Sequence, residues 1–151
     1  MPTKVKTARL WRADIENVPG RLAAALGPLS AAGADLQVVM AYRYPGDPSR
    51  AAIEVYPVTG RKQAAAAAAG GLAAASIPML WVEGDNRPGL GASVARAMAE
   101  AGINMSFLVA QVSGRKYSAV FGFENESDAK RGTVLIKKAA AAPKKRTAKK
   151  R

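Results

Sequence analysis

Apolar residues recur with helical spacing in two parts of the chain, each time directly after a Pro-Gly pair. The later stripe consists of Leu90, Val94, Met98 and Ala101, and the earlier one of Leu22, Leu26 and Leu29. Side chains at intervals of three and four residues lie on one face of a helix. The pattern therefore predicts two amphipathic helices. Pro28 is expected to kink or weaken the first, and Gly33 and Gly102 are expected to end them in a left-handed conformation.

Alternating apolar residues follow each helix and predict a strand, a hairpin and a further strand. The later strand should point Ile103, Met105, Phe107 and Val109 to one side, and the earlier one Leu36, Val38 and Met40. We place the hairpin turns at residues 113–116 and in a longer loop at 44–49. The remaining elements are expected at residues 8–13 and 79–83 (first strands), 51–58 and 117–124 (third strands), and 61–69 and 127–138 (second helices), the last with Ser127 as its cap.

The two segments are copies of one pattern. Residues 17–20, Asn-Val-Pro-Gly, align with residues 86–89, Asn-Arg-Pro-Gly, at an offset of 69. Trp11 aligns with Trp81 after a slip to an offset of 70, and Ala52-Ile53 align with Ala119-Val120 after a change in loop length. A fixed period of this kind indicates a repeated structural unit. The predicted domains are residues 1–76, residues 77–139 and a disordered basic tail at residues 140–151.

The order strand-helix-strand-strand-helix in each copy predicts the fold class. In the second copy, a fourth strand would have to come from residues 133–136, which fit a helix equally well. Split βαβ arrangements of this kind form ferredoxin-like sandwiches. We therefore predict an α+β protein of two ferredoxin-like βαββαβ sandwiches in tandem, each an antiparallel sheet with its helices on one face. Because unpaired strand edges favour association, a homodimer or higher homo-oligomer is expected.

Charge is unevenly distributed over the two copies and the tail. The net charge is +12, yet residues 1–136 hold 15 basic and 11 acidic residues, whereas residues 137–151 hold 8 basic and no acidic ones. The basic residues at the end are Lys144, Lys145, Arg146, Lys149, Lys150 and Arg151. Such a run attracts nucleic acid by counterion release, without sequence preference. A contribution to solubility alone is the simpler explanation of the same residues.

Missing residue types exclude several classes of function. The chain has no cysteine and no histidine, so disulfides, zinc sites built on Cys or His, thiol nucleophiles and Ser-His-Asp triads are excluded. The remaining residues suggest no set of nucleophile, base and orienting group, and we expect neither an enzyme nor a metal or cofactor.

Two further patterns concern membranes. Residues 63–82 carry no charge and are long enough to span a bilayer. Their alanine, glycine and proline content favours a helix, a turn and a strand instead. The N-terminal residues lack the apolar segment of a signal peptide. We therefore expect a cytoplasmic protein without membrane contact.

The second Pro-Gly turn offers a surface for an anion. Pro88 suits the first position of a helix, and Gly89 and Gly91 let another group approach the backbone closely. The first N–H groups of a helix have no intrahelical acceptors and lie at the positive end of the helix dipole. They therefore suit a carboxylate or a phosphate. Pro-Gly pairs also start helices without any ligand, and that structural explanation stands beside the functional one.

Acceptors for a cation lie beside the same turn. Asp85 and Asn86 directly precede it, and Asn104, at the start of the next strand, is expected to reach the same corner. Acceptors next to a helix N-terminus suit a zwitterion such as a free amino acid. The first copy has Glu16 in place of Asp85 and Leu22 in place of Gly91, so close approach to its backbone is harder.

The stretch Asp-Asn-Arg-Pro-Gly-Leu at residues 85–90, followed by an amphipathic helix and Gly-Ile-Asn at residues 102–104, resembles the ACT domain. The typical family motif is one residue shorter between the aspartate and the proline, and the resemblance covers about 130 residues as a tandem pair. It implies a module that binds amino acids or similar molecules at an interface between two ACT modules. The residues so implicated are Asp85, Asn86, Arg87, Pro88, Gly89, Leu90, Gly91, Ile103 and Asn104, with Asn17, Gly20 and Arg21 of the first copy as a partner wall.

Two alternatives to a sensor are compatible with parts of the sequence. An RNA-recognition module has the same strand order, and residues 116–123 have an aromatic appearance, but Ser118 and Val120 stand where stacking aromatic residues are needed. Trp11 and Trp81 are more typical of a core or an interface. We therefore expect a regulatory protein that senses a small molecule, an amino acid above all, and acts on a separate enzyme or transcription factor. The alternative is a nucleic-acid-associated protein that uses its basic tail.

Overall fold

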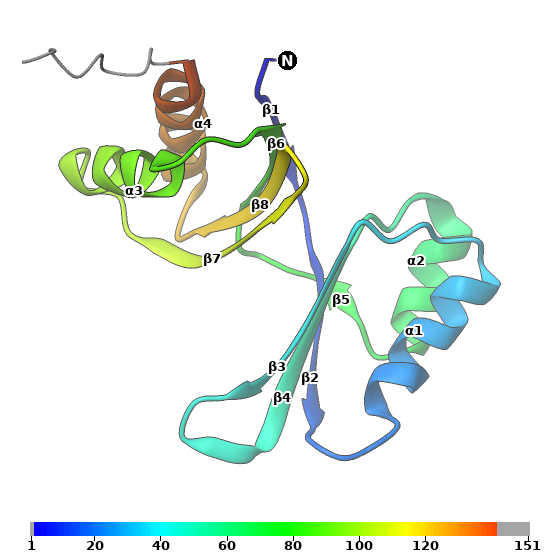
Figure 1. Cartoon of the computed structure of the whole chain (residues 1–151). Coiled ribbons are helices and arrows are strands. Elements are labelled where there is room, and N and C mark those ends of the chain that lie inside the picture. Colours follow the sequence, from blue (N-terminus) through cyan, green and yellow to red (C-terminus); the bar gives the residue numbers. More distant parts are fainter. Residues whose placement is uncertain (1, 142–151) are drawn as a thin grey trace, which may run out of the picture. The chain divides into compact units, whose positions relative to one another are not determined.

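The computed structural model describes residues 2–141 (Figure 1). The strands are β1 (Lys4–Ala8), β2 (Trp11–Glu16), β3 (Val38–Tyr44), β4 (Asp47–Tyr56), β5 (Ala73–Ala74), β6 (Met79–Asp85), β7 (Met105–Ser113) and β8 (Lys116–Phe123). The helices are α1 (Arg21–Ala31), α2 (Gly60–Ala69), α3 (Leu90–Glu100) and α4 (Glu126–Ala141).

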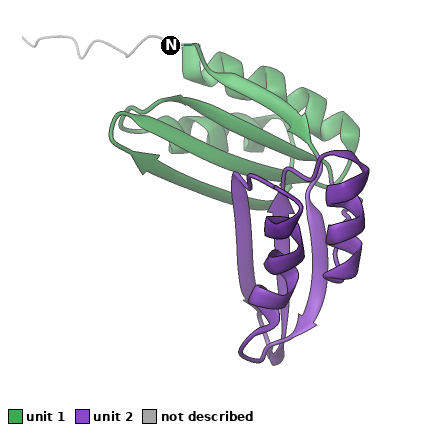
Figure 2. Ribbon diagram, turned by 90° about the vertical axis from the view of Figure 1, so that its right-hand side faces the viewer, with its two compact units in different colours: residues 1–8, 78–151 green, residues 9–77 purple. Residues whose placement is uncertain are grey.

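These elements form two compact units, each with one four-stranded antiparallel sheet (Figure 2). Unit 1 contains the chain up to Ala8 and from Pro78 onward, with the strand order β1-β6-β8-β7. Unit 2 contains residues 9–77, with the strand order β3-β4-β2-β5. In unit 1 α3 and α4 cover one face of the sheet, and in unit 2 α1 and α2 do so (Figure 1). The predicted class, α+β with two ferredoxin-like sandwiches, is confirmed.

The two units are nested in the chain, which differs from the predicted division at residue 76. β1 pairs with β6 in antiparallel register, with Lys4 opposite Glu83 and Ala8 opposite Met79. The first strand of the chain therefore completes the sheet of unit 1, and unit 2 is inserted between β1 and β6. Residues 133–136, the expected source of a fourth strand, lie within α4 instead. They are helical because Ala129 and Ile136, about two turns apart, both pack into the core.

Unit 1 has the larger core side chains. Its core contains Leu80, Val82, Leu90, Val94, Met98, Ile103, Ala119, Phe121, Phe123, Ala129 and Ile136. The core of unit 2 contains Ala13, Ala25, Leu29, Ile53, Val55, Ala67 and Leu72. In unit 2, the alanines let the helices come close together: a Cβ atom at Gly70, just after α2, would lie 3.0 Å from the carbonyl oxygen of Ala25 in α1.

Both helix ends behave as the glycines predicted, and the kink or weakening expected at Pro28 stays a prediction. Gly33 and Gly102 follow α1 and α3 with φ of 78° and 69°, which confirms the left-handed conformation. Pro28 lies inside α1 without ending it. The last turn persists because the next residue, Leu29, is fully buried in the core of unit 2, and its burial offsets the missing backbone hydrogen bond.

The alternation predicted for residues 103–109 is interrupted by a register irregularity between Met105 and Phe107. Met105 pairs with Phe123 and packs against the core under the helices, whereas Phe107 pairs with Gly122 on the other, helix-free face. Phe107 fits there because Gly122 has no side chain; a Cβ atom at that position would overlap the Phe107 ring. One inserted residue of this kind reverses the facing of every residue after it.

Two turn predictions also need correction. The first hairpin turns at Pro45-Gly46, because β4 already begins at Asp47, so the expected long loop at 44–49 is absent. The cap of α4 is Asn125, not Ser127: the Asn125 Oδ1 atom accepts a hydrogen bond from the Asp128 N–H at 2.8 Å. The second hairpin turns at Gly114-Arg115, as predicted.

The two tryptophans do not occupy equivalent positions. The offset of 69 between the copies holds along β2 and β6 as well, without the predicted slip to 70, and the tryptophans are 70 residues apart. Trp11 pairs with Val55 and packs against the core of unit 2. Trp81 pairs with Val120 on the helix-free face of unit 1, where the Lys6 Nζ atom lies 5.7 Å from the ring centroid.

Between residues 2 and 141, no helix is both long and apolar enough to cross a membrane. The uncharged run at residues 63–82 is instead divided among α2, β5 and β6.

Candidate functional site

The Pro-Gly turn has the same backbone geometry in both units. Gly89 and Gly20 are the residues directly before α3 and α1, and both have left-handed φ, 81° and 92°. Residues with a Cβ atom rarely adopt this conformation, so glycine is required there. The first helical residue is Leu90 rather than the expected Pro88, which lies before the cap.

Each turn is anchored to the hairpin of its own sheet. The Asn86 N–H donates to the Arg115 carbonyl oxygen at 2.8 Å, and the Asn17 N–H donates to the Ser49 carbonyl oxygen at the same distance. The backbone of the turn is therefore fixed against the sheet before any ligand arrives. Both copies share this contact, which a backbone N–H of any residue except proline could make.

Helix α3 begins with unsatisfied donors. No side chain among residues 2–141 caps its N-terminus, and no acidic residue lies in its first turn. The Leu90 N–H makes a long hydrogen bond of 3.3 Å to the Arg87 carbonyl oxygen. The first-turn N–H groups therefore remain open to an external acceptor. Helix α1 of unit 2 starts in the same uncapped way.

A cavity of about 270 Å³ lies beside this helix end in unit 1. It is bounded by β6, the Pro-Gly turn, α3, the outer part of β7, β8 and α4. Its lining residues are Val82, Asn86, Leu90, Gly91, Val94, Leu108, Ala110, Gln111, Val112, Tyr117, Ala119, Phe121 and Ile136. The cavity is a little smaller than most pockets for drug-sized ligands and suits a smaller molecule.

Three of the site residues expected from the sequence line this cavity: Asn86, Leu90 and Gly91. Pro88 and Gly89 shape the turn without lining it. The Arg87 guanidinium donates to the Ala139 carbonyl oxygen at the end of α4. This contact ties the turn to the last helix.

Ile103 and Asn104 lie away from the turn. Ile103 is buried in the core, and the Asn104 Nδ2 atom donates to the Glu124 Oε1 atom at 3.2 Å. The expectation that Asn104 reaches the corner of the turn does not fit this geometry. β7 begins opposite Phe123, whereas β6 reaches the turn opposite Lys116, at the other end of β8. Helix α3 carries the chain back along the sheet, so the residues that follow it lie far from its N-terminus.

Asp85, expected to bind an ammonium group of a ligand, is paired within the chain. Its Oδ1 atom accepts from the Lys116 Nζ atom at 2.5 Å, and both side chains are about half exposed. This hydrogen bond lowers the pKa of Asp85 to about 2. The carboxylate is therefore ionised at neutral pH and joins β6 to β8 at the turn.

Unit 2 has a smaller cavity in the corresponding place, of about 180 Å³. Asn17 and Arg21 line it, as do Glu16, Leu22 and Arg43, whereas Gly20 does not. The Asn17 Nδ2 atom donates to the Pro48 carbonyl oxygen at 2.8 Å. Asn17 and Arg21 therefore belong to a cavity of unit 2 itself, and their expected role as a wall of a shared site stays a prediction.

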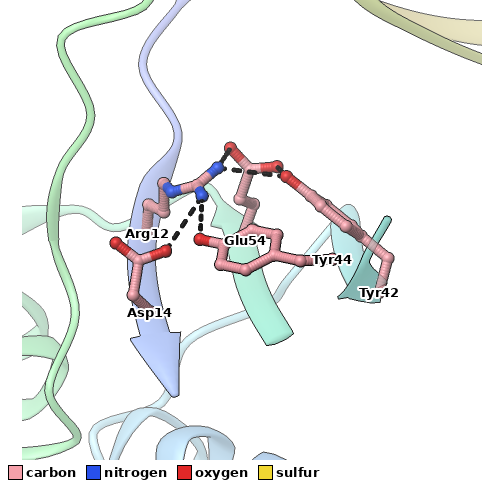
Figure 3. Close-up of polar contacts among 5 residues, drawn as sticks. All are labelled: Arg12, Asp14, Tyr42, Tyr44 and Glu54. Atoms are coloured by element: carbon pink, nitrogen blue, oxygen red, sulfur yellow. Dashed lines mark hydrogen bonds and ion pairs between the residues drawn. The ribbon is translucent and has the colours of Figure 1, made fainter. Parts of the chain in front are cut away.

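The structure also reveals a polar network that sequence patterns did not suggest, on the helix-free face of the unit 2 sheet (Figure 3). The Arg12 guanidinium donates to the Glu54 carboxylate at 3.5 Å and to the Asp14 carboxylate at 2.9 Å. It also donates to the hydroxyl groups of Tyr42 and Tyr44. The Tyr42 hydroxyl in turn donates to the second oxygen of Glu54 at 3.0 Å. The network thus joins β2, β3 and β4.

Glu54 is the most deeply buried member of this network, with a side chain that is only 1% exposed. A buried carboxylate needs such partners to offset its lost hydration. Burial, and after it the Glu54 carboxylate, raise the pKa of Tyr42 above its usual value. Tyr42 therefore stays protonated and continues to donate at neutral pH. The signal in the sequence was one charged residue within the apolar run at residues 51–55.

On β8, the helix-free face carries Ser118, Val120 and Gly122, so this strand presents no aromatic ring on the open side. The stacking platform of an RNA-recognition module is absent from this strand. The basic residues Lys144 to Arg151 lie outside the described residues. Their predicted disorder and their predicted contact with nucleic acid stay predictions.

No family model matches the sequence, and no curated protein matches it. Solved structures do match. Protein BT0572 from Bacteroides thetaiotaomicron has a TM-score of 0.72 at 15% identity, with 89% of both chains covered. The regulatory subunit of aspartate kinase from Thermus thermophilus has a TM-score of 0.63 at 19% identity, with 92% of this chain and 97% of that chain covered.

A third match is to part of a longer chain. Aspartate kinase from Clostridium acetobutylicum has a TM-score of 0.55 at 13% identity, and the match covers 89% of this chain but 33% of that one. Identities this low show the fold alone. Together with the nested sheets and the shared Pro-Gly turn, these matches show that the chain has a fold of two ferredoxin-like units, similar to the ACT fold.

Proposed function

We propose that this protein is a non-catalytic regulator that binds a free amino acid in the cavity of unit 1. The observation that carries the proposal is that cavity, placed against the uncapped start of α3. The amino acid carboxylate accepts from the first-turn N–H groups near Leu90 and Gly91, and its ammonium group donates to the side-chain oxygen of Asn86 or Gln111. The similarity to regulatory subunits of aspartate kinase supports a regulatory role.

A second copy of the chain is the proposed assembly partner. β7 forms an edge of the unit 1 sheet and pairs there only with β8 among the described strands. Its side chains Leu108, Val109 and Val112 are 44%, 49% and 55% exposed. Exposed apolar edge strands favour pairing with another strand. Because Leu108 and Val112 also line the cavity, pairing along β7 would link ligand binding to assembly. A separate enzyme or transcription factor then reads the liganded dimer.

The test is a thermal-shift screen of the whole protein against the twenty amino acids and common nucleotides. A ligand that binds only the folded state stabilises it by about 2.7 kcal/mol at a concentration of a hundred times Kd. We expect at least one amino acid to raise Tm. If no amino acid does so at millimolar concentration, the proposal fails and the fold serves as a scaffold only.

A matched variant locates the site. Gly91→Leu introduces the residue that unit 2 has at the equivalent position, Leu22. A Cβ atom at Gly91 meets no other atom within 4 Å, and Gly91 lines the cavity, so the longer side chain is expected to occupy it. The variant should lose the Tm response, while the free protein should melt at or slightly above the wild-type temperature because leucine is the better helix former. An unchanged Tm response would show that the ligand does not bind at the start of α3.

A second function, binding of nucleic acid, is favoured by the charge on α4. Lys130, Lys137 and Lys138 are exposed and lie on one side of that helix, which leads into the basic C-terminal run. We propose that this surface and Lys144 to Arg151 together contact phosphates. Removal of residues 144–151 should weaken binding to a random DNA duplex and flatten its dependence on salt. Equal affinity and salt dependence in the truncated protein would end this second proposal.

A further inference from the structure

We infer that the unit 1 cavity selects an amino acid with an uncharged, apolar side chain, an inference that rests on the proposed function. Within the described part of the chain, the residues that line the cavity include no aspartate, glutamate, lysine or arginine. Their polar side-chain groups are the amides of Asn86 and Gln111 and the hydroxyl of Tyr117. A charged side chain would lose its hydration there without gaining an ionic partner.

The most deeply buried part of the lining is wholly apolar. Val82, Ile136 and Phe121 are 0%, 1% and 5% exposed, and all three belong to the core of unit 1. By contrast, Asn86 and Gln111 are exposed residues. The amino and carboxyl groups of a ligand therefore meet the polar residues at the exposed end, while its side chain extends toward the core. The side chain gains by leaving water in proportion to its apolar area.

The charged residues nearest to the turn are engaged elsewhere. Asp85 and Lys116 pair with each other, and Arg87 donates to the end of α4. None of the three lines the cavity. They therefore provide no direct partner for a charged ligand side chain, even though they follow or precede lining residues in the sequence.

The size of the cavity fits the same class of ligand. Its volume of about 270 Å³ is roughly that of nine water molecules in the liquid. A free amino acid with a medium aliphatic chain, such as leucine or norleucine, fills a space of this order.

Unit 2 provides an internal contrast for this inference. Its smaller cavity is lined by Glu16, Arg21 and Arg43 in addition to apolar residues. The same fold can therefore place charges around the corresponding space, and unit 1 does not. The uncharged lining of unit 1 is a property of its own residues and not of the architecture.

The experiment compares ligands of equal shape by titration calorimetry on the whole protein. Norleucine is lysine without its ammonium group, and leucine has nearly the shape of aspartate. We expect norleucine and leucine to bind about a hundredfold more tightly than lysine and aspartate. Comparable or tighter binding of lysine or aspartate would overturn the apolar selectivity and leave the proposed function standing. No binding by any amino acid would overturn both.

A charged residue introduced into the cavity tests the same selectivity by changing the protein instead of the ligand. Leu108 lines the cavity but is 44% exposed, so Leu108→Glu is tolerated by the fold. This variant should bind norleucine about tenfold more weakly. It should also bind lysine more tightly, so the ratio of norleucine affinity to lysine affinity falls further. The matched control is Val134→Glu on α4, a residue that is 66% exposed and does not line the cavity. Equal effects of the two variants would contradict the inference.

Discussion

Units 1 and 2 begin their first helices from the same turn and yet present different cavities. In both, a glycine with left-handed φ precedes the helix, and a backbone N–H at the turn donates to the hairpin. The cavities differ because Leu90 and Gly91 in unit 1 correspond to Arg21 and Leu22 in unit 2. The comparison teaches that Pro-Gly belongs to the shared architecture, whereas the second glycine is specific to unit 1, where it lines the larger cavity.

The helix-free faces of the two sheets differ as well. In unit 2 this face carries the Arg12 network around the buried Glu54 (Figure 3). By strand register, the corresponding positions in unit 1 are Trp81 and Val120, which pair with each other. One unit thus stabilises its sheet with ionic and phenolic hydrogen bonds, and the other with apolar contact.

The largest effect should come from opening the unit 2 network. Arg12→Leu leaves the Glu54 carboxylate buried with Tyr42 as its main donor, and we expect a loss of about 3 kcal/mol in the free energy of unfolding of unit 2. Urea unfolding followed by hydrogen exchange of the β4 amides measures this loss. Asp14→Asn removes an exposed partner of the same arginine and should cost less than about 1 kcal/mol. Equal losses of stability in Arg12→Leu and Asp14→Asn would show that the burial of Glu54 does not cause the loss in Arg12→Leu.

The next effect concerns the pair Phe107–Gly122, which corresponds to Val38–Tyr56 in unit 2. The larger residue of the pair is Phe107 on the edge strand β7 in unit 1, and Tyr56 on the central strand β4 in unit 2. Gly122→Ala should destabilise unit 1 by about 2 kcal/mol, because its Cβ atom overlaps the Phe107 ring. The double variant with Phe107→Val should recover most of this loss. Additive losses, measured by urea unfolding, would contradict the steric explanation.

A smaller effect follows from exchanging the residues that distinguish the two turns. Gly91→Leu should stabilise α3, and Leu22→Gly should destabilise α1, each by up to about 1 kcal/mol, because glycine is a poor helix former. Differential scanning calorimetry of the free proteins measures both changes. Destabilisation by Gly91→Leu would show that the space beside Gly91 is needed by the fold and not by a ligand.

The smallest effect is the acid dependence of Asp85. Because its folded-state pKa is lowered from 3.8 to about 2 by the hydrogen bond from Lys116, its contribution to stability is fully present above about pH 4. This contribution is lost as pH falls toward 2. The stability difference between the wild-type protein and Asp85→Asn should therefore be largest at pH 7 and fall to a small fraction of that value at pH 2 in urea titrations. A difference of undiminished size at pH 2 would point to another role for Asp85.

Much of this fold follows from local patterns in the sequence. Helices α1 and α3 were visible because their apolar residues recur at helical spacing, and Gly33 and Gly102 marked their ends. The nesting was not visible, because the pairing of β1 with β6 joins segments about 75 residues apart and leaves no local signal. The reversed facing of Phe107 was missed for a related reason, since a single inserted residue reverses it.

The site was predictable only where it is local in the sequence. Asn86, Leu90 and Gly91 belong to one turn and could be named from their residue types and spacing. Gln111, Tyr117 and Ile136 come from β7, β8 and α4, which meet at the cavity only in the folded unit. Asn104 was misplaced because its type suited the chemistry while its position depended on the direction of α3.

We propose that unit 1, and not unit 2, binds the ligand. Amide chemical shifts of the whole protein, followed while norleucine is added, distinguish the two units. We expect saturable shifts at Asn86, Gly91 and Gln111, with no change at Asn17, Arg21 and Arg43. Shifts confined to the turn of unit 2, or no shift in either turn at millimolar norleucine, would contradict it.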